Sequence, residues 1–101
     1  MPKITIEHDS TLEPREAFKK VSEFLNTDKD LKKMDPQYSC QFDESQLSGT
    51  AKGKMFSADL KIKERPQGGS QVAINIQIPL ALAMMKGIIQ STLQKKISKV
   101  L

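Results

Sequence analysis

Residues 55–78, MFSADLKIKERPQGGSQVAINIQI, hold the clearest structural pattern in this chain of 101 residues. Apolar side chains occupy every second position on both sides of a central segment, namely Phe56, Ala58, Leu60 and Ile62 before it and Val72, Ile74, Ile76 and Ile78 after it. A period of two is typical of a half-buried strand. The segment between them, Pro66-Gln67-Gly68-Gly69, is typical of a turn. The stretch therefore predicts two antiparallel strands joined as a hairpin.

The part of the chain before this hairpin contains three shorter strand patterns. Residues 3–8 and 38–43 alternate apolar and polar side chains, whereas residues 46–52 form a weaker pattern that ends at Gly53. Cys40 lies in the second pattern, and no histidine near it in sequence could activate its thiol. We therefore expect a buried core residue there rather than a nucleophile. With the hairpin, these segments predict an antiparallel sheet of four to five strands.

A first helix is predicted over residues 12–26. Four apolar residues fall on one face at the helical period: Ala17, Val21, Phe24 and Leu25. Ser10 or Thr11 is placed to cap its first turn. A straight continuation would put Asp28 on the apolar face. The pattern therefore predicts a break at Asn26-Thr27, with Thr27 capping a short second turn through Lys33.

A second, longer helix is predicted over Leu80–Val100, directly after Pro79. Its core-facing stripe comprises Leu82, Met85, Ile89, Leu93, Ile97 and Val100. A second stripe, about 120° away, changes from apolar to basic and comprises Ala81, Met84, Ile88, Lys95 and Lys99. Two interpretations stay open at this point. The second stripe packs against another part of the domain, or it is an exposed face for a partner or a lipid-like surface.

These elements predict an α+β fold in one domain, residues 1–101. The predicted order is one strand, one helix, four further strands and a final helix, with the N-terminal helix and the long C-terminal helix facing the sheet. A chain of this length can bury a single core.

Charge is distributed unevenly along the chain. The 16 lysines and arginines exceed the 12 acidic residues, and the segment 65–101 contains no acidic residue at all. Its basic residues are Arg65, Lys86, Lys95, Lys96 and Lys99. We expect this segment either to meet something anionic or to serve as a solvated helix face.

Several kinds of function are disfavoured by the residues present. The chain has one cysteine and one histidine, so we expect no disulfide, no metal site and no cofactor. No nucleophile is paired with a base, which predicts a protein that is not an enzyme. Few aromatic residues and no phosphate-binding glycine motif argue against specific nucleic-acid recognition. The longest apolar run, 78–85, is too short for a transmembrane segment, and no signal peptide is visible, so we expect a cytoplasmic location.

Particular residues resemble a known family. They are the strand over residues 2–8, Leu12 and Ala17 after it, the strand following Gly53, and the segments Leu80-Ala81-Leu82 and Lys86-Gly87-Ile88-Ile89. In their order and spacing, over nearly the whole chain, these resemble the bacterial polyhydroxyalkanoic acid system family. The chain departs from that pattern in residues 28–35 and in its Gly-Gly turn. The resemblance implies an association with storage-polyester systems and carries over no catalytic residue.

Together these observations predict a noncatalytic binding or structural module associated with a polyhydroxyalkanoate system. It would bind the granule surface or a granule protein through the C-terminal helix, and a homodimer is possible. The residues expected to form that surface are Ala81, Met84, Lys86, Ile88, Lys95, Lys96 and Lys99. The alternative is a small acyl-chain carrier with a pocket between sheet and helix, in which Met34, Met55, Met84 and Met85 would form adaptable walls.

Overall fold

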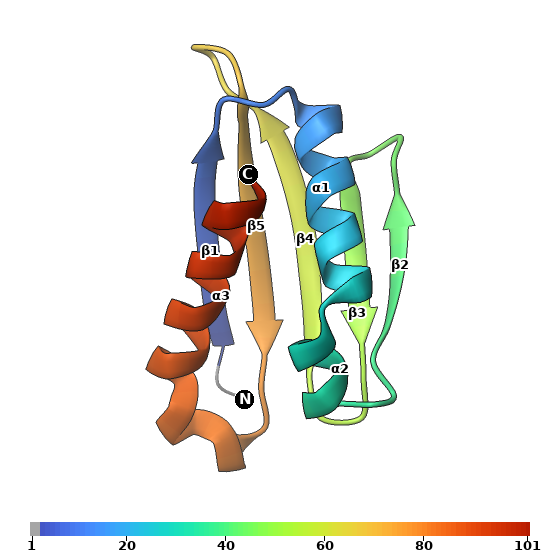
Figure 1. Ribbon diagram of the computed structural model, residues 1–101, viewed down its shortest axis with the longest axis vertical. Coiled ribbons are helices and arrows are strands. Elements are labelled where there is room, and N and C mark those ends of the chain that lie inside the picture. The colour runs from blue at the N-terminus through green and yellow to red at the C-terminus, as the bar shows by residue number, and fades with distance from the viewer. Residues whose placement is uncertain (1–2) are drawn as a thin grey trace.

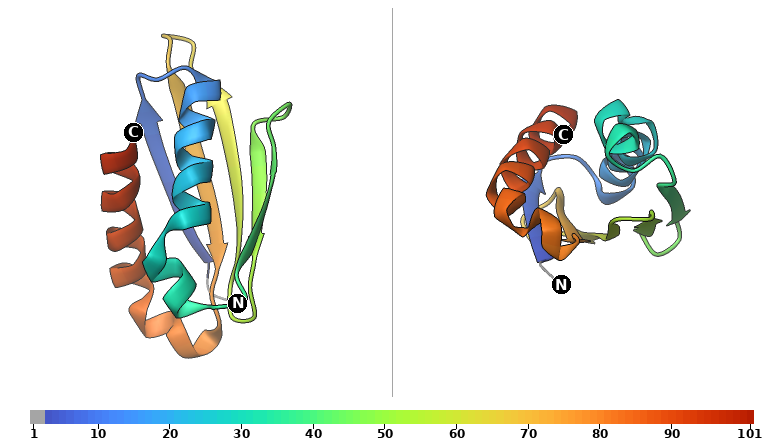
Figure 2. Two further views of the ribbon diagram at one scale, coloured as in Figure 1. Left: turned by 45° about the vertical axis from the view of Figure 1, so that its right-hand side comes forward. Right: turned by 90° about the horizontal axis from the view of Figure 1, so that it is seen from below.

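A computed structural model describes residues 3–101, with all side chains in that range except those of Asp30 and Met34. A five-stranded antiparallel sheet carries its helices on one face and curves around them (Figures 1 and 2). In chain order the elements are β1 (Lys3–Ser10), α1 (Pro14–Thr27), α2 (Lys29–Met34), β2 (Ser39–Asp43), β3 (Ser48–Lys52), β4 (Ser57–Glu64), β5 (Ser70–Gln77), the 3₁₀ helix η1 (Leu80–Met85) and α3 (Lys86–Val100). The predicted α+β class and the strand count are confirmed.

The strand order β1-β5-β4-β3-β2 is set by a central hairpin. Strands β4 and β5 pair in register from Ser57 opposite Gln77 to Glu64 opposite Ser70, and the first strand of the chain then joins the free side of β5. The connecting turn needs glycine, because Gly68 and Gly69 have φ angles of 98° and 81°. A Cβ on Gly69 would also collide with the carbonyl oxygen of Ser10.

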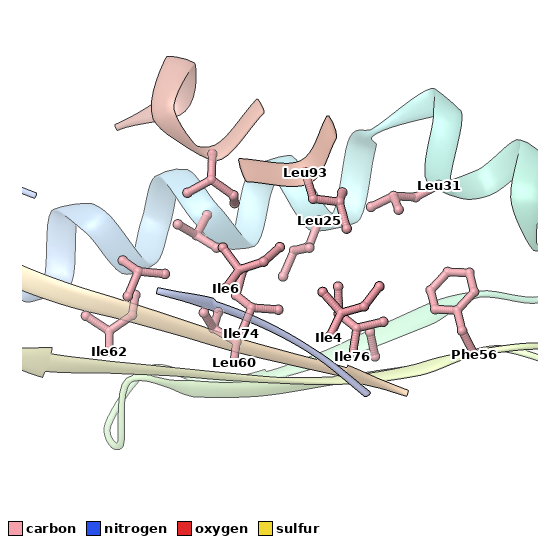
Figure 3. Close-up of a cluster of buried hydrophobic side chains, with 14 of the residues drawn as sticks. Ile4, Ile6, Leu25, Leu31, Phe56, Leu60, Ile62, Ile74, Ile76 and Leu93 are labelled. Atoms are coloured by element: carbon pink, nitrogen blue, oxygen red, sulfur yellow. The ribbon is translucent and has the colours of Figure 1, made fainter. Parts of the chain in front are cut away.

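The core lies between the inner face of the sheet and the helices (Figure 3). Side chains at alternate positions of β1, β5 and β4 point into it: Ile4, Ile6, Leu60, Ile62, Val72, Ile74 and Ile76. Helix α1 covers them with Ala17, Phe18, Val21 and Leu25, whereas Phe24, predicted on this face, is only partly buried. The outer face of the sheet is polar, as shown by Thr5, whose hydroxyl donates to Asn75 Oδ1 at 3.1 Å.

The break after α1 is confirmed, but both predicted caps are wrong. Ser10 Oγ accepts from the backbone N of Leu12, two residues before the helix begins, and α1 itself starts at Pro14 without a side-chain cap. At the break, Thr27 donates to the carbonyl of Glu23, while Asp28 caps α2 by accepting from Leu31 N at 3.1 Å. A carboxylate competes well for this position because it also favours the positive end of the helix dipole.

The predicted C-terminal helix is two elements rather than one. Its first turns form η1, and the α-helix begins only at Lys86. Helix α3 then lies along β1, where Gln90 and Gln94 donate from their amides to the carbonyls of Thr5 and Glu7, each at 3.2 Å. These bonds satisfy carbonyls on an edge strand that pairs only with β5. The helix is therefore held over the edge of the sheet rather than over its centre.

Asp35 ties the end of α2 to the β3–β4 turn. Its buried carboxylate accepts from the backbone N of Met55 at 2.7 Å and of Gln37 at 3.2 Å. The bond from Met55 holds the pKa of Asp35 below its usual value, although burial opposes this shift. The stability from this lowered pKa is present above the unfolded pKa and is lost as the pH falls through the folded one.

Gly53→Ala is expected to destabilise the protein by about 1–3 kcal/mol, because the new Cβ would collide with the Asp35 carboxylate. Urea denaturation followed by circular dichroism measures the change. Gly87→Ala is the matched control, since a Cβ there meets no atom and alanine favours a helix. Equal unfolding midpoints for the Gly53 variant and wild type would contradict the role assigned to Asp35.

Candidate functional site

An apolar cavity of about 140 Å³ opens between α3, the start of α2 and the sheet. Its walls come from residues far apart in sequence: Leu31, Phe56, Ile76, Ile78, Leu82, Ile88, Ile89 and Leu93. Asp28, Thr92 and Lys96 supply its polar groups. Ile76 on β5 and Ile78 just after this strand form the floor, and residues four apart on α3 form one wall. The cavity walls therefore follow the same strand and helix periodicities that place side chains in the core.

A second, smaller space of about 20 Å³ lies deeper, next to the first. The two share Leu31, Phe56, Ile76 and Leu93 as walls. Figure 3 shows Leu31 and Leu93 above Phe56 and Ile76, with the helices on one side and the sheet on the other. An apolar molecule that displaced these shared side chains slightly would reach from the outer cavity to the inner one.

Tyr38 lines the inner space and is 8% exposed. Its ring packs at 5.3 Å, centroid to centroid, from that of Phe56. Its hydroxyl is buried and has no strong hydrogen-bond partner among the described residues, because its polar neighbour is the thiol of Cys40. Nearby Cys40 donates its thiol proton to the carbonyl of Leu25 at 3.7 Å, and a thiol sulfur is only a weak acceptor. A buried hydroxyl without a partner costs about 1–3 kcal/mol.

Burial raises the pKa of Tyr38 far above its usual value, and the neighbouring Cys40 and Asp28 add to the shift. The hydroxyl is therefore neutral at every physiological pH. It can donate one hydrogen bond and accept others. Among the residues that line the inner space, Tyr38 is the one with a polar group on its side chain.

An ion pair closes one side of the cavity mouth. Lys96 Nζ lies 3.0 Å from Asp28 Oδ1 and 3.2 Å from Oδ2, and both side chains are largely buried. The pair joins α3 to the break between α1 and α2. It holds Asp28, which also caps α2, in position beside the cavity. The two charges thus fix the helices that enclose the site.

Two larger hollows are less suited to a small ligand. One, of about 480 Å³, lies over the sheet strands β2, β3 and β4 and includes Gln41, Thr50 and Asp59. The other, of about 600 Å³, lies beside α1 and Glu44. Both are open to solvent and have walls that are partly polar, so water competes there for the polar groups. The smaller apolar cavity excludes water better.

The structure divides the residues that the sequence assigned to a binding surface. Six are exposed: Ala81, Met84, Lys86, Ile88, Lys95 and Lys99. The second stripe is therefore an exposed face rather than part of the core. Lys96 instead lies at the cavity mouth with Asp28. Ile88 belongs to both places, since it lines the cavity and is 66% exposed.

The alternative drawn from the sequence placed a pocket between sheet and helix, but it assigned the wrong walls. Of the methionines predicted as pocket walls, Met55, Met84 and Met85 are exposed and do not line it, and the side chain of Met34 lies outside the described part. Tyr38 was assigned only to a strand. The one sequence feature that pointed to this site was Asp28, a charged residue that a straight helix would have placed on its apolar face.

Within residues 3–101, no helix combines the length and apolar character needed to cross a bilayer. The described side chains also contain no group of three histidine, cysteine, aspartate or glutamate residues arranged to hold a metal ion.

No family model and no curated protein matches this chain by sequence. Solved structures do resemble it in fold. The crystal structure of TTHA0849 from Thermus thermophilus is 10% identical, with a TM-score of 0.58 over 98% of this chain and 91% of that one. The crystal structure of Ara h 8.0201 is 14% identical, with a TM-score of 0.54 over 98% and 97% of the two chains. At these identities the likeness concerns the fold, a helix laid against a curved antiparallel sheet. The storage-polymer association stays a prediction.

Proposed function

We propose that this protein binds a small, mostly apolar molecule in the cavity between α3 and the sheet. The observation that carries the proposal is the cavity itself, whose walls are almost entirely isoleucine, leucine and phenylalanine. This corresponds to the carrier alternative raised from the sequence. The fold likeness to two solved structures is consistent with it only through the shared arrangement of a helix laid against a curved sheet.

The volume limits the ligand to a small molecule. A cavity of about 150 Å³ lined by leucine, isoleucine and phenylalanine stays dry and binds benzene. The cavity here, at about 140 Å³, is of that size. A single aromatic ring or a short acyl chain fits this space, whereas a long fatty acid would have to extend through the mouth past Ile88.

The unpartnered hydroxyl of Tyr38 favours a ligand with one neutral polar group. A ligand hydroxyl or carbonyl reaching the inner space would supply the missing hydrogen bond. A carboxylate is disfavoured there, because burying a charge without a cation is costly and Lys96 is already paired with Asp28. We therefore infer an alcohol, ketone or ester of small size.

The proposal is of binding rather than catalysis. The polar groups of the site already serve the structure, since Asp28 caps α2 and pairs with Lys96. Tyr38 stays protonated, so no tyrosinate is present to act as a general base.

Tyr38→Phe is expected to have two opposite effects. Without ligand it stabilises the protein by about 1 kcal/mol, because it removes a buried hydroxyl that has no partner. With ligand it weakens the preference for phenol over toluene, two molecules of nearly the same shape, by about tenfold. Calorimetric titration of both compounds gives the ratio, and thermal unfolding gives the stability.

Ser70→Ala is the matched control for this experiment. Ser70 has the other buried hydroxyl without a partner, and it lies outside the cavity at the start of β5. The control should leave the phenol-to-toluene ratio unchanged. An unchanged ratio in Tyr38→Phe as well would refute the role given to the tyrosine, and absence of binding by folded wild-type protein would refute the proposed function.

A further inference from the structure

Exposed large apolar side chains gather at one end of the molecule. In the described part of the chain these are Met55, Leu80, Met84, Met85 and Ile88. Met55 lies in the β3–β4 turn, and the others lie in η1 and the first turn of α3. Figure 1 shows that the β3–β4 turn, η1 and α2 are all at its lower end, where the paired strands finish at Gln77, Ser57 and Lys52. We call this the apolar tip.

The exposure of these side chains is large enough to need an explanation. Met84 is 97% exposed, Leu80 79% and Ile88 66%. Single exposed apolar residues are common, whereas a contiguous group marks a surface that meets something else. No side chain of η1 is fully buried. Packing of the core therefore does not explain why η1 is apolar.

Exposed lysines are concentrated at the same end as the apolar tip. Seven exposed lysines lie on the elements that form this end: Lys3, Lys29, Lys32, Lys33, Lys52, Lys54 and Lys86. The acidic residues at the same end are few. Asp28 is paired with Lys96, Asp35 is buried in backbone hydrogen bonds, and Asp30 is the third. This end of the molecule therefore carries a net positive charge.

The opposite end has the reverse balance. The start of α1 and the β2–β3 and β4–β5 turns lie there (Figure 1). Their neighbourhood contains Asp9, Glu13, Glu16, Asp43, Glu44 and Glu64. These outnumber the basic residues beside them, which are Arg15, Lys61, Lys63 and Arg65. Such a charge dipole orients the molecule in the field of an anionic surface, with the apolar tip facing that surface.

We propose that the apolar tip docks onto an anionic lipid surface. Leucine, methionine and isoleucine would enter the boundary between headgroups and acyl chains, while the surrounding lysines meet the lipid phosphates. The surface differs from the one expected from the sequence. It uses lysines of α2 and of the β3–β4 turn instead of Lys95 and Lys99 on the later turns of α3.

Other occupants fit these observations less well. A second copy bound symmetrically through the same face would bring the lysines of the two copies together. Their like charges would repel. Nucleic acid would meet the lysines but would gain nothing from aliphatic side chains, which do not stack on bases as aromatic rings do. Lipid satisfies both the charge and the apolar residues.

The position of the tip connects this proposal to the cavity. Ile88 belongs to the tip and also lines the cavity, and Leu82 of η1 lines it from the same side. A protein docked in this way would present the cavity mouth to the lipid. The docking proposal goes beyond the proposed ligand binding and does not require it.

The test measures flotation of the purified protein with vesicles. One set contains phosphatidylcholine alone, and the other contains phosphatidylglycerol as well. We expect binding to the anionic set that weakens with salt. A Leu80→Ser/Met84→Ser variant should lose at least about tenfold in affinity, because both side chains would otherwise be buried in lipid. Both residues are exposed, so the variant should fold, as thermal unfolding will verify.

A matched pair of charge variants tests the role of the lysines. Lys32→Gln/Lys33→Gln at the tip should lose about fivefold for each lysine. Lys19→Gln/Lys20→Gln removes two adjacent exposed lysines from α1, away from the tip, and should bind nearly as wild type. An equal loss in both pairs would overturn the proposed orientation.

Three further outcomes would overturn the proposal. They are no flotation of wild type at low salt, unchanged binding by Leu80→Ser/Met84→Ser, and a dimer in solution that this variant converts to monomer. Flotation with uncharged polyhydroxyalkanoate particles but not with anionic vesicles would likewise overturn it. Ile89→Trp, which blocks the cavity, should still bind vesicles, so failure of docking and failure of ligand binding can be distinguished.

Discussion

Ile89→Trp is expected to abolish binding of phenol and toluene, with a loss of at least about tenfold in affinity. Ile89 is half-buried on the wall that α3 presents to the cavity. An indole there would occupy the space of about 140 Å³ that the ligand needs. Stability should change by less than about 1.5 kcal/mol, since the added ring fills an existing space rather than a packed core.

Ser91→Trp is the matched control for this prediction. It adds the same ring to the same helix at an exposed residue that does not line the cavity. Binding of both compounds should stay at the wild-type level. Calorimetric titration compares the three proteins. Undiminished binding in a folded Ile89→Trp variant would show that the ligand lies elsewhere.

Ile74→Ala is expected to cost about 3–4 kcal/mol of unfolding free energy, within the usual range for such truncations. Ile74 is 2% exposed on β5, the strand between β1 and β4, and packs between the sheet and α1. The alanine leaves a cavity that the paired strands on either side cannot close. The free energy of unfolding of a domain is about 5–15 kcal/mol in total, so the expected loss is a large fraction of it.

Asn75→Ala serves as the comparison for that measurement. It changes the next residue of the same strand, which faces the outer side of the sheet and accepts from Thr5 at 3.1 Å. Its expected cost is below about 1 kcal/mol. Urea denaturation measures both variants. Similar costs for the two would contradict the assignment of the core to one face of the sheet.

The hairpin and the first helix could be predicted from the sequence because their signals are local. Alternation over residues 55–78 and the glycines between the strands require no knowledge of the rest of the chain. The place of β1 beside β5 is different. It depends on pairing between residues such as Ile4 and Ile76, which are far apart in sequence. No local pattern specifies that choice.

The start of the last helix shows the limit of periodicity. Residues 80–85 have helical spacing and good helix formers, yet they form a 3₁₀ helix. Leu80 and Met84 have nothing to pack against, and tertiary packing is what normally stabilises an α-helix of this length. The sequence pattern was correct for α3, where Leu93 and Ile97 reach the core.

The candidate site was accessible from the sequence only in part. The residues of the second stripe could be identified from their spacing. Whether that stripe is exposed or packs against the rest of the domain could not be predicted. The ion pair between Lys96 and Asp28 joins residues 68 positions apart. The cavity depends on this pair and on the break before α2, so only the folded chain shows it.

The central claim is that the apolar cavity binds a small ligand, and chemical-shift mapping tests it most directly. Labelled wild-type protein is titrated with phenol while amide resonances are followed by NMR. The account predicts saturable shifts centred on Leu31, Phe56, Ile76 and Leu93, the residues shared by the outer and inner spaces. Shifts centred on Gln41, Thr50 and Asp59 of the open outer hollow, or no saturable shift at all, would contradict it.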